Sequence, residues 1–299
     1  MGINLPAVCI GDNLQTMSLQ RTIKINRLHH LLEEGLLAST GWLEEHGYNR
    51  TNLSTYVRSG YLVSPVRGIY RRPGPPLKWQ HVVASLQLMH AKWAHVGGRT
   101  ALVHHGHGHY LRMVGKDEIL LYGPEGVPPW VGKLGLEERF APRSDAMFHT
   151  LRAGHGEAGQ FVAFPNAPLE RSRIDDFGLK VVTWGAWDWQ LLFSGEERAV
   201  MELLQDVPAR ESIHEAYLLF QGLANLKPAL VSSLLAACGN VKVKRLFLAL
   251  ADRCGHAWFK YLDLAGVDLG RGRRMLVPGG RLDSKYDITL PADLDDHAR

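Results

Sequence analysis

Apolar residues repeat at helical spacing near the start of the chain. The repeat predicts one helix with a single buried face, which is formed by Ile25, Leu28, Leu32 and Leu36. A second short helix follows, with Ser39 or Thr40 as its N-cap and with Trp42 and Leu43 as its apolar pair. Two short amphipathic helices in succession predict a small helical unit that still needs a third element to cover its core.

A third helix and a tight hairpin complete this pattern. Residues 49–58 form the predicted helix, and Asn49 is a suitable N-cap for it. Two short runs, 61–63 and 69–72, predict strands that flank a turn at 64–68. Three helices followed by a hairpin are the order of parts in a winged helix-turn-helix, which places its last helix in the major groove of DNA.

The two faces of the third predicted helix differ in chemistry. Leu53, Tyr56 and Val57 share one face and are expected to pack against the other two helices. The opposite face has no acidic residue, and its polar side chains are Thr51, Thr55 and Arg58, flanked by Asn52 and Ser54. These side chains are of the types that bond phosphate oxygens and base edges. We therefore predict that this face binds DNA.

The hairpin and the start of the helix add cations to this predicted interface. Arg67 lies at the expected tip of the hairpin, where a wing would cross a neighbouring DNA backbone. The complete predicted DNA-binding set is Arg50, Thr51, Asn52, Ser54, Thr55, Arg58, Arg67, Arg71 and Arg72. The alternative is a small helical subdomain with a solvated polar face, because short helix-turn-helix patterns also arise by chance.

The remaining pattern predicts a second, larger domain. The Pro-rich run at 73–76 is a stiff spacer, so we expect a winged-helix domain at 1–76, with 1–22 as a tail, and a C-terminal domain at 77–299. The second domain should contain a helix at 78–94, strands at 118–122, 160–164 and 179–184, helices at 196–205, 210–225, 228–238, 241–252 and 255–263, and hairpins within 267–291. The predicted fold class is mixed α/β.

Positive charge is concentrated near the C-terminus. Residues 242–285 contain ten Lys or Arg and four acidic residues, a balance of +6 (10 − 4). The predicted second basic surface consists of Lys242, Lys244, Arg245, Lys260, Arg271, Arg273, Arg274 and Arg281. It could bind phosphates of flanking DNA or of RNA. Equally, it could be a solvated hairpin whose arginines pair with Asp263, Asp268 or Asp283.

Composition fits a globular protein of the cytoplasm. The net charge is +4 and the hydrophobic content is 45%, so extensive disorder is not expected. Cys9, Cys238 and Cys254 form no CxxC pair and are expected to be free thiols in a reducing compartment. No apolar run is long enough to span a membrane, and the N-terminus lacks an export signal.

Other candidate motifs do not have the geometry that catalysis or metal binding needs. Asp117 and Glu118 are adjacent, so they would point to opposite faces of a strand and could not hold the metals of a nucleotidyltransferase. The segment 126–134 is one residue too long for a phosphate loop. Four histidines, which could bind a metal only if a loop brought them together, are His104, His105, His107 and His109. We expect no catalytic residue, no metal and no cofactor.

Several segments, in this order and at this spacing, resemble a known family. They are 50–53, 56–62 and 67–74, then 95–102, 109–111 and 121–124, and near the C-terminus 243–247, 255–258, 270–274 and 286–291. Together they are similar to the AbiEi-type antitoxins of type IV toxin–antitoxin modules. The resemblance implies a repressor that binds inverted repeats in its own promoter. It also implies a partner nucleotidyltransferase toxin, whose neutralisation does not require direct contact with this chain. The tRNA that such a toxin modifies is a possible ligand of the second basic surface. A degenerate nucleotidyltransferase or an RNA- or protein-interaction module remains the alternative.

Overall fold

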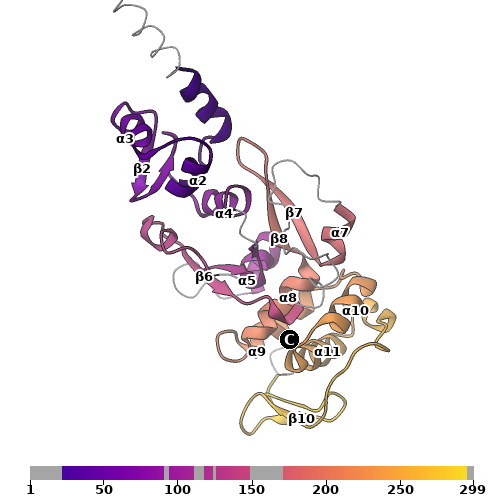
Figure 1. The fold of residues 1–299 in the computed structure, drawn as a ribbon. Helices are drawn as coiled ribbons and strands as arrows, with labels where there is room; N and C mark the ends of the chain where they lie inside the picture. Colours follow the sequence, from indigo (N-terminus) through magenta and orange to yellow (C-terminus); the bar gives the residue numbers. More distant parts are fainter. Residues whose placement is uncertain (1–21, 91–93, 111–117, 124–125, 149–170, 295–299) are drawn as a thin grey trace, which may run out of the picture. The chain divides into compact units, whose positions relative to one another are not determined.

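The chain divides into two units between Ser85 and Leu86, and each is described by itself (Figure 1). The structure is a computed structural model that describes residues 22–90, 94–110, 118–123, 126–148 and 171–294. The first unit consists of a helix at 22–31, β1 (Ala38–Ser39), α2 (Thr40–Glu45), α3 (Arg50–Arg58), β2 (Val63–Val66) and β3 (Ile69–Arg71), and most of α4 (Trp79–Leu88). Its strands form one antiparallel sheet in the order β1-β3-β2.

Local side-chain caps set the helices of the first unit. The Ser39 hydroxyl accepts a hydrogen bond from the Trp42 N–H at 3.2 Å, and Asn49 Oδ1 accepts one from the Asn52 N–H at 2.9 Å. Each cap satisfies an N–H that the first turn of a helix leaves without a partner. The apolar residues that were expected to face inward are buried, namely Ile25, Leu28, Leu32, Leu36, Leu43, Leu53 and Tyr56. Three helices and a two-stranded wing are therefore confirmed.

Some details of the first unit differ from the expectation. β1 was not predicted, because two residues carry no periodic signal. β2 spans Val63–Val66 and not 61–63, and the turn at Gly68 has a φ of +80°, which a glycine adopts without strain. Val57 is 37% exposed, so it does not belong to the core.

The end of the first unit lies later than the Pro-rich run suggests. Ser85 on α4 is fully buried, and its hydroxyl accepts a hydrogen bond from the Leu37 N–H at 2.8 Å. The same hydroxyl donates to the His81 carbonyl at 2.6 Å. The segment 73–76 is therefore a turn within the first unit, and the two units divide inside α4.

A mixed five-stranded sheet forms the centre of the second unit. Its order is β6 (Arg139–Arg143), β5 (Glu118–Tyr122), β4 (His95–Val96), β8 (Trp189–Ser194) and β7 (Leu179–Trp184). The pairs β5–β6 and β4–β8 are parallel, whereas β4–β5 and β7–β8 are antiparallel. The predicted strands at 118–122 and 179–184 are confirmed, β6 and β8 were not predicted, and 160–164 lies outside the described residues.

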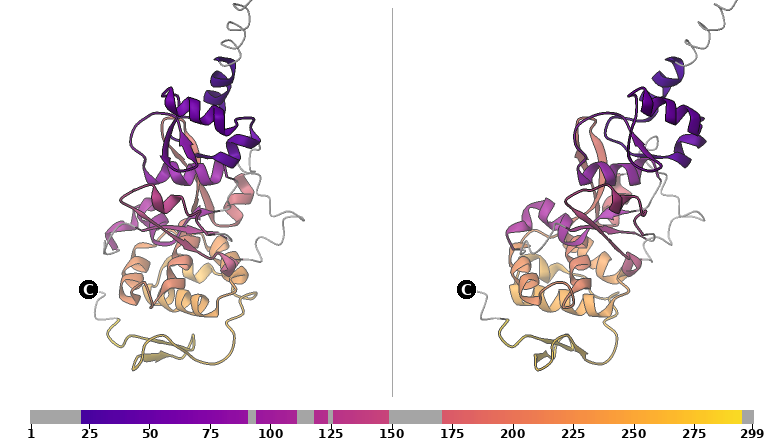
Figure 2. Two further views of the ribbon diagram at one scale, coloured as in Figure 1. Left: turned by 60° about the vertical axis from the view of Figure 1, so that its left-hand side comes forward. Right: turned by 90° about the vertical axis from the view of Figure 1, so that its left-hand side faces the viewer.

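Helices cover this sheet and lead to a small second sheet. Figures 1 and 2 show α8 (Glu196–Asp206), α9 (Ile213–Gly222), α10 (Pro228–Ala237) and α11 (Val241–Cys254) gathered in one layer. The shorter helices are α5 (Gly98–Leu102), η1 (Val103–His107), η2 (Gly108–Tyr110), η3 (Val131–Lys133), η4 (Ala146–Phe148), α7 (Arg171–Asp176) and η5 (Ala257–Tyr261). The second sheet has the order β10 (Arg281–Asp283), β11 (Ile288–Leu290) and β9 (Arg274–Met275). None of the described helices has the length and hydropathy to cross a membrane.

A buried carboxylate joins α8 to the sheet. Glu202 is 1% exposed. Its carboxylate lies 2.7–2.9 Å from four groups, which are His95 Nε2, Arg198 Nε, the Ser194 hydroxyl and the Gly98 N–H. A Cβ at Gly97 would clash with Glu202 Oε2, so the glycine pair at 97–98 is required for this close approach. The two glycines within the segment 95–102 therefore have a structural role.

Candidate nucleic-acid interface

The helix α3 has an apolar face that is buried and a polar face that is exposed. Leu53 and Tyr56 lie fully inside the first unit. Thr51, Ser54 and Arg58 are exposed on the other side. Because the apolar face is buried, with the Tyr56 ring 6.4 Å from that of Tyr48, the polar face is held at the surface of the unit, as a recognition helix is in this fold.

The start of α3 carries an exposed ion pair. Arg50 Nε lies 3.2 Å from Glu44 Oε1 at the end of α2. The side chains are 83% and 43% exposed, so water screens the pair and Arg50 can exchange Glu44 for a phosphate. Glu44 was not predicted as a neighbour of Arg50, because the turn that joins α2 to α3 decides which side chains meet.

Two of the predicted contact residues are only partly accessible. Thr55 is half-buried, and its hydroxyl donates to the Thr51 carbonyl at 2.9 Å. Asn52 is half-buried, and its Oδ1 is turned inward without a hydrogen-bond partner among the described residues. The Asn52 side chain would therefore have to rotate before it could form two hydrogen bonds with adenine. Thr51, Ser54 and Arg58 are already exposed.

The three arginines predicted on the wing, which is the β2–β3 hairpin, have different roles. Arg67 is exposed at the turn. Arg71 donates to the Gly74 and Pro75 carbonyls, each at 2.9 Å, and burial lowers its pKa. Arg72 donates to the His29 carbonyl at 3.5 Å. Arg71 and Arg72 are thus half-buried and bonded to backbone carbonyls of their own unit, and their contact with DNA stays a prediction.

The predicted second basic surface is only partly a surface. Lys244 and Arg245 are buried, and Lys242 is half-buried with its ammonium donating to the Gln205 and Val207 carbonyls at 2.8 and 2.6 Å. Lys244 and Arg245 are therefore corrected as members of an accessible surface. The exposed members are Lys260, Arg271, Arg273, Arg274 and Arg281.

The guanidinium of Arg245 has an internal role that the sequence did not reveal. It donates to four backbone carbonyls, which belong to Leu269, Gly270, Gly272 and Asp287. Because both glycines have positive φ values (65° and 76°), this turn is a fixed conformation around one buried cation.

Asp283 pairs with Arg253 at 3.2 Å, and within the described residues no acidic side chain pairs with Arg271, Arg273, Arg274 or Arg281.

The four clustered histidines do not converge on one point. His105 Nε2 lies 2.8 Å from the Ser194 carbonyl, and His107 Nε2 lies 2.8 Å from Glu196 Oε1. His109 Nδ1 lies 3.2 Å from the Gly106 carbonyl, and burial lowers the pKa of His104. Over the described part of the chain, no group of three or more His, Cys, Asp or Glu side chains is placed to hold a metal ion.

The other motifs also have structural explanations. Glu118 begins β5 and lies 3.9 Å from Arg143, while Asp117 lies outside the described residues. The segment at 126–134 contains the short helix η3. Trp189 is buried and its ring lies 5.9 Å from that of Trp184, whereas Trp187 is 50% exposed. Two of these tryptophans therefore form a packing pair.

Three helices and an antiparallel wing with an exposed cationic face define the first unit as a winged helix-turn-helix. A family model for the N-terminal domain of AbiEi antitoxin transcriptional regulators matches residues 21–113. A second model, for the AbiEi antitoxin and transcriptional regulator of type IV toxin–antitoxin systems, matches residues 167–291. The chain belongs to this AbiEi family, which confirms the resemblance seen in the sequence. The family is one of regulatory antitoxins and not of enzymes.

Two further comparisons, with curated proteins and with solved structures, were also made. None of the curated proteins matches it. Among solved structures, the crystal structure of the RV2827C protein from Mycobacterium tuberculosis matches with 17% sequence identity and a TM-score of 0.49. That match covers 87% of this chain and 89% of the other chain.

Proposed function

We propose that the protein is an autorepressor in which α3 enters the major groove of operator DNA in the cytoplasm. The observation that carries the proposal is the face of α3 on which Thr51, Ser54 and Arg58 are exposed above a buried apolar side. Base contacts would come from Thr51 and Ser54, with Asn52 and Thr55 joining after rotation of their side chains. Phosphate contacts would come from Arg58 and, on the wing, Arg67.

The number of contacts requires two copies on DNA. One small winged-helix module has few accessible side chains for the grooves, and specific affinity usually needs a larger interface. Inverted repeats would place two copies about one helical turn apart, on the same face of the duplex. The proposed operator is therefore an inverted repeat in the promoter of the protein's own operon.

Salt dependence of operator binding tests this assignment. Each phosphate contact that is lost should lower the slope of log affinity against log salt concentration by about one unit. Arg58→Ala and Arg67→Ala should each flatten the slope in a fluorescence anisotropy titration with promoter DNA. The matched control is Lys78→Ala, which removes an exposed cation of the first unit outside the proposed interface. If the slope of log affinity against log salt concentration is unchanged in both arginine variants, α3 and the wing are not part of the DNA interface.

We further propose that the second unit counteracts a nucleotidyltransferase toxin encoded beside this gene, without a stable complex. Both halves match AbiEi family models, which supports assigning repression to the first unit and counteraction of the toxin to the second. Because α4 takes part in both units, overlapping fragments 1–90 and 79–299 each retain it whole. Co-expressed with the toxin gene, 1–90 should repress a promoter reporter and 79–299 should restore growth. Rescue of growth by 1–90 alone would contradict the assignment.

A further inference from the structure

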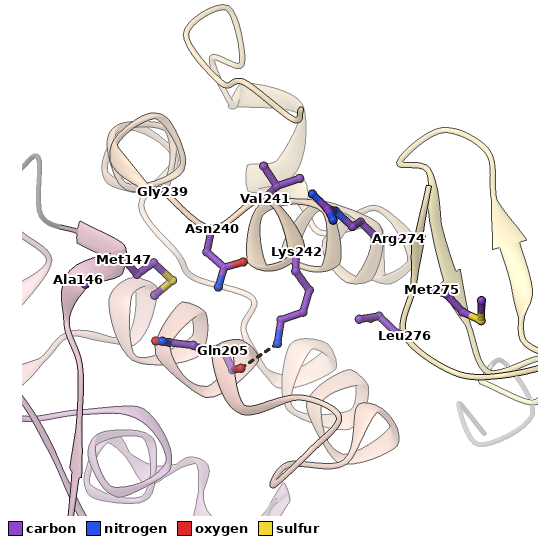
Figure 3. Close-up of a pocket in the computed structure, with 10 residues that line it drawn as sticks. All are labelled: Ala146, Met147, Gln205, Gly239, Asn240, Val241, Lys242, Arg274, Met275 and Leu276. Atoms are coloured by element: carbon purple, nitrogen blue, oxygen red, sulfur yellow. Dashed lines mark hydrogen bonds between the residues drawn. The ribbon is translucent and has the colours of Figure 1, made fainter. Parts of the chain in front are cut away.

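The second unit contains a pocket that the regulatory function does not explain. It has a volume of about 640 Å³ and lies where the end of α8, the start of α11, η4 and β9 meet (Figure 3). This volume is within the usual range for sites that bind a small organic ligand. The side chains that matter below are Met147, Gln205, Asn240, Lys242, Arg274 and Met275.

The polar groups of this pocket favour an anion. Lys242 and Arg274 line it, and none of its ten lining residues is acidic. Lys242 uses two of its three N–H donors on the Gln205 and Val207 carbonyls. Arg274 is exposed, has no ion pair among the described residues, and extends toward the start of α11 in Figure 3. A guanidinium fork is suited to a phosphate, which it can bind through two parallel hydrogen bonds.

The remaining walls suit a flat ring with polar edges. Met147 is buried and lines the pocket beside Gln205, whereas Met275 is 72% exposed and lies at the opposite side in Figure 3. Thioethers adapt to aromatic rings and contact them favourably. Gln205 Oε1 is buried and has no hydrogen-bond partner among the described residues. The Gln205 and Asn240 side-chain amides lie on the same side as Met147 in Figure 3, and an amide can pair with the polar edge of a base.

The wall that carries Arg274 is fixed before any ligand arrives. β9 pairs with β11 through Arg274 and Ile288, and the Arg274 N–H donates to the Asp287 carbonyl at 2.8 Å. Arg245 donates to the carbonyls of Gly272 and Asp287 on the same segment. The backbone of Arg274 is thus held on both sides, so little backbone ordering would be needed on binding.

We propose that this pocket binds a nucleotide, with its phosphate at Arg274 and Lys242 and its base against Met147. The absence of acidic groups from the lining means that binding does not use a bridging Mg²⁺. The ligand is either a free nucleotide or one nucleotide of a single strand, because both present a phosphate beside an unpaired base. The site is separate from the proposed DNA interface of the first unit.

Calorimetric titration of the full-length protein with AMP in the presence of EDTA tests the proposal. AMP should bind with one-to-one stoichiometry, and adenosine and inorganic phosphate should each bind more weakly. Arg274→Ala should weaken AMP binding at least about tenfold, because it removes a charge-assisted contact. The matched control Arg281→Ala removes an exposed arginine of the same small sheet that does not line the pocket, and should change affinity less than about twofold.

The second arm separates the two sources of nucleotide. A single-stranded tetranucleotide that binds more tightly than AMP, with the same dependence on Arg274, identifies a strand as the ligand, whereas equal affinity identifies a free nucleotide. No binding of either up to about 1 mM would overturn the proposal. Equal losses in Arg274→Ala and Arg281→Ala, or tighter binding of an acidic peptide, would also overturn it. Operator binding by Arg274→Ala reports separately on the first unit and should be unchanged.

Discussion

Arg58 and Arg67 lie at the surface of the first unit, whereas Arg198 and Arg245 in the second unit are buried and bonded to other parts of the chain. The first unit has an apolar core, and side chains cap the starts of two of its helices. In the second unit, buried charges link segments that are far apart in sequence, as Glu202 does with His95 and Arg245 with Gly270. A high count of cations in a segment therefore says little about a nucleic-acid surface until their exposure is known.

The same difference predicts how the two units respond to substitution. Removing a surface cation from the first unit changes binding and leaves the fold intact, because an exposed charge contributes little to stability. Removing a buried charge from the second unit leaves its partner without compensation in a region that excludes water. The comparison can thus be tested by measuring stability and operator binding on the same variants.

The largest expected effect is that of Glu202→Ala. The substitution leaves Arg198 and His95 buried without their shared carboxylate. Loss of one partner from a buried ion pair typically costs about 3–5 kcal/mol of unfolding free energy. Urea denaturation followed by circular dichroism should show this loss. The control Glu137→Ala, at an exposed acid of the same unit, should change the unfolding free energy by less than about 0.5 kcal/mol.

Acid should reproduce the effect of this substitution in the unmodified protein. Burial alone would raise the pKa of Glu202, but His95 and Arg198 lower it from 4.5 to about 2. Because the folded pKa is below the unfolded one, this stabilisation is complete above about pH 4.5 and is lost as the pH falls toward 2. Glu202→Ala should lose less stability than the unmodified protein over this interval. If the unfolding free energies of the two proteins fall in parallel as the pH is lowered, Glu202 does not contribute as described.

The second largest effect is expected for Arg245→Met. The change keeps the length of the side chain but removes the donors to four backbone carbonyls, those of Leu269, Gly270, Gly272 and Asp287. We expect a loss of about 3 kcal/mol and faster hydrogen exchange across 269–289. Arg273→Met, at an exposed neighbour, should leave both unchanged. Equal exchange in the two variants would show that Arg245 does not hold this turn.

A smaller effect is expected for Ser85→Ala, which tests where the first unit ends. The substitution removes the acceptor for the Leu37 N–H, which lies in the core. An unsatisfied buried donor costs about 1–3 kcal/mol. The unfolding transition of fragment 1–90 should therefore shift, whereas Ser54→Ala on the exposed face of α3 should shift it by less than about 0.5 kcal/mol. If Ser85→Ala does not shift the unfolding transition, the first unit ends at the Pro-rich run and not within α4.

Features set by neighbouring residues could be predicted from the sequence. The caps Ser39 and Asn49 and the apolar spacing of the first helix act within one or two turns, so they are visible in a short window. The same holds for the helices of 196–254, whose apolar faces repeat regularly. The winged-helix fold follows from these local signals and the glycine turns.

Features set by distant residues could not be predicted. The carbonyls that bind Arg245 belong to residues 24–42 positions further along the chain, and no local pattern indicates which residues will meet. Arg71 appears in the sequence as one more cation of the wing, yet the turn at 73–76 brings two carbonyls to its guanidinium. The exposure of a polar residue is thus decided by the completed fold, so it cannot be predicted from neighbouring residues alone.

The smallest expected effect concerns Glu44, the acid beside the proposed DNA interface. Its pair with Arg50 is exposed on both sides, so Glu44→Gln should change the unfolding free energy by less than about 0.5 kcal/mol. Operator binding should nevertheless improve. The substitution removes a negative charge near the phosphates and frees Arg50 to contact them, and both changes favour association.

The improvement should be about two- to threefold at low salt and should shrink as salt rises, because exposed charges are screened within roughly 10 Å at 0.1 M salt. Glu137→Gln is the matched control, since it changes the net charge equally at an exposed acid of the second unit. If operator affinity rises equally in both variants, net charge alone governs binding and α3 has no special place in it. If it rises only for Glu44→Gln, DNA approaches the chain at the start of α3, and the surface charges of the first unit are its binding groups.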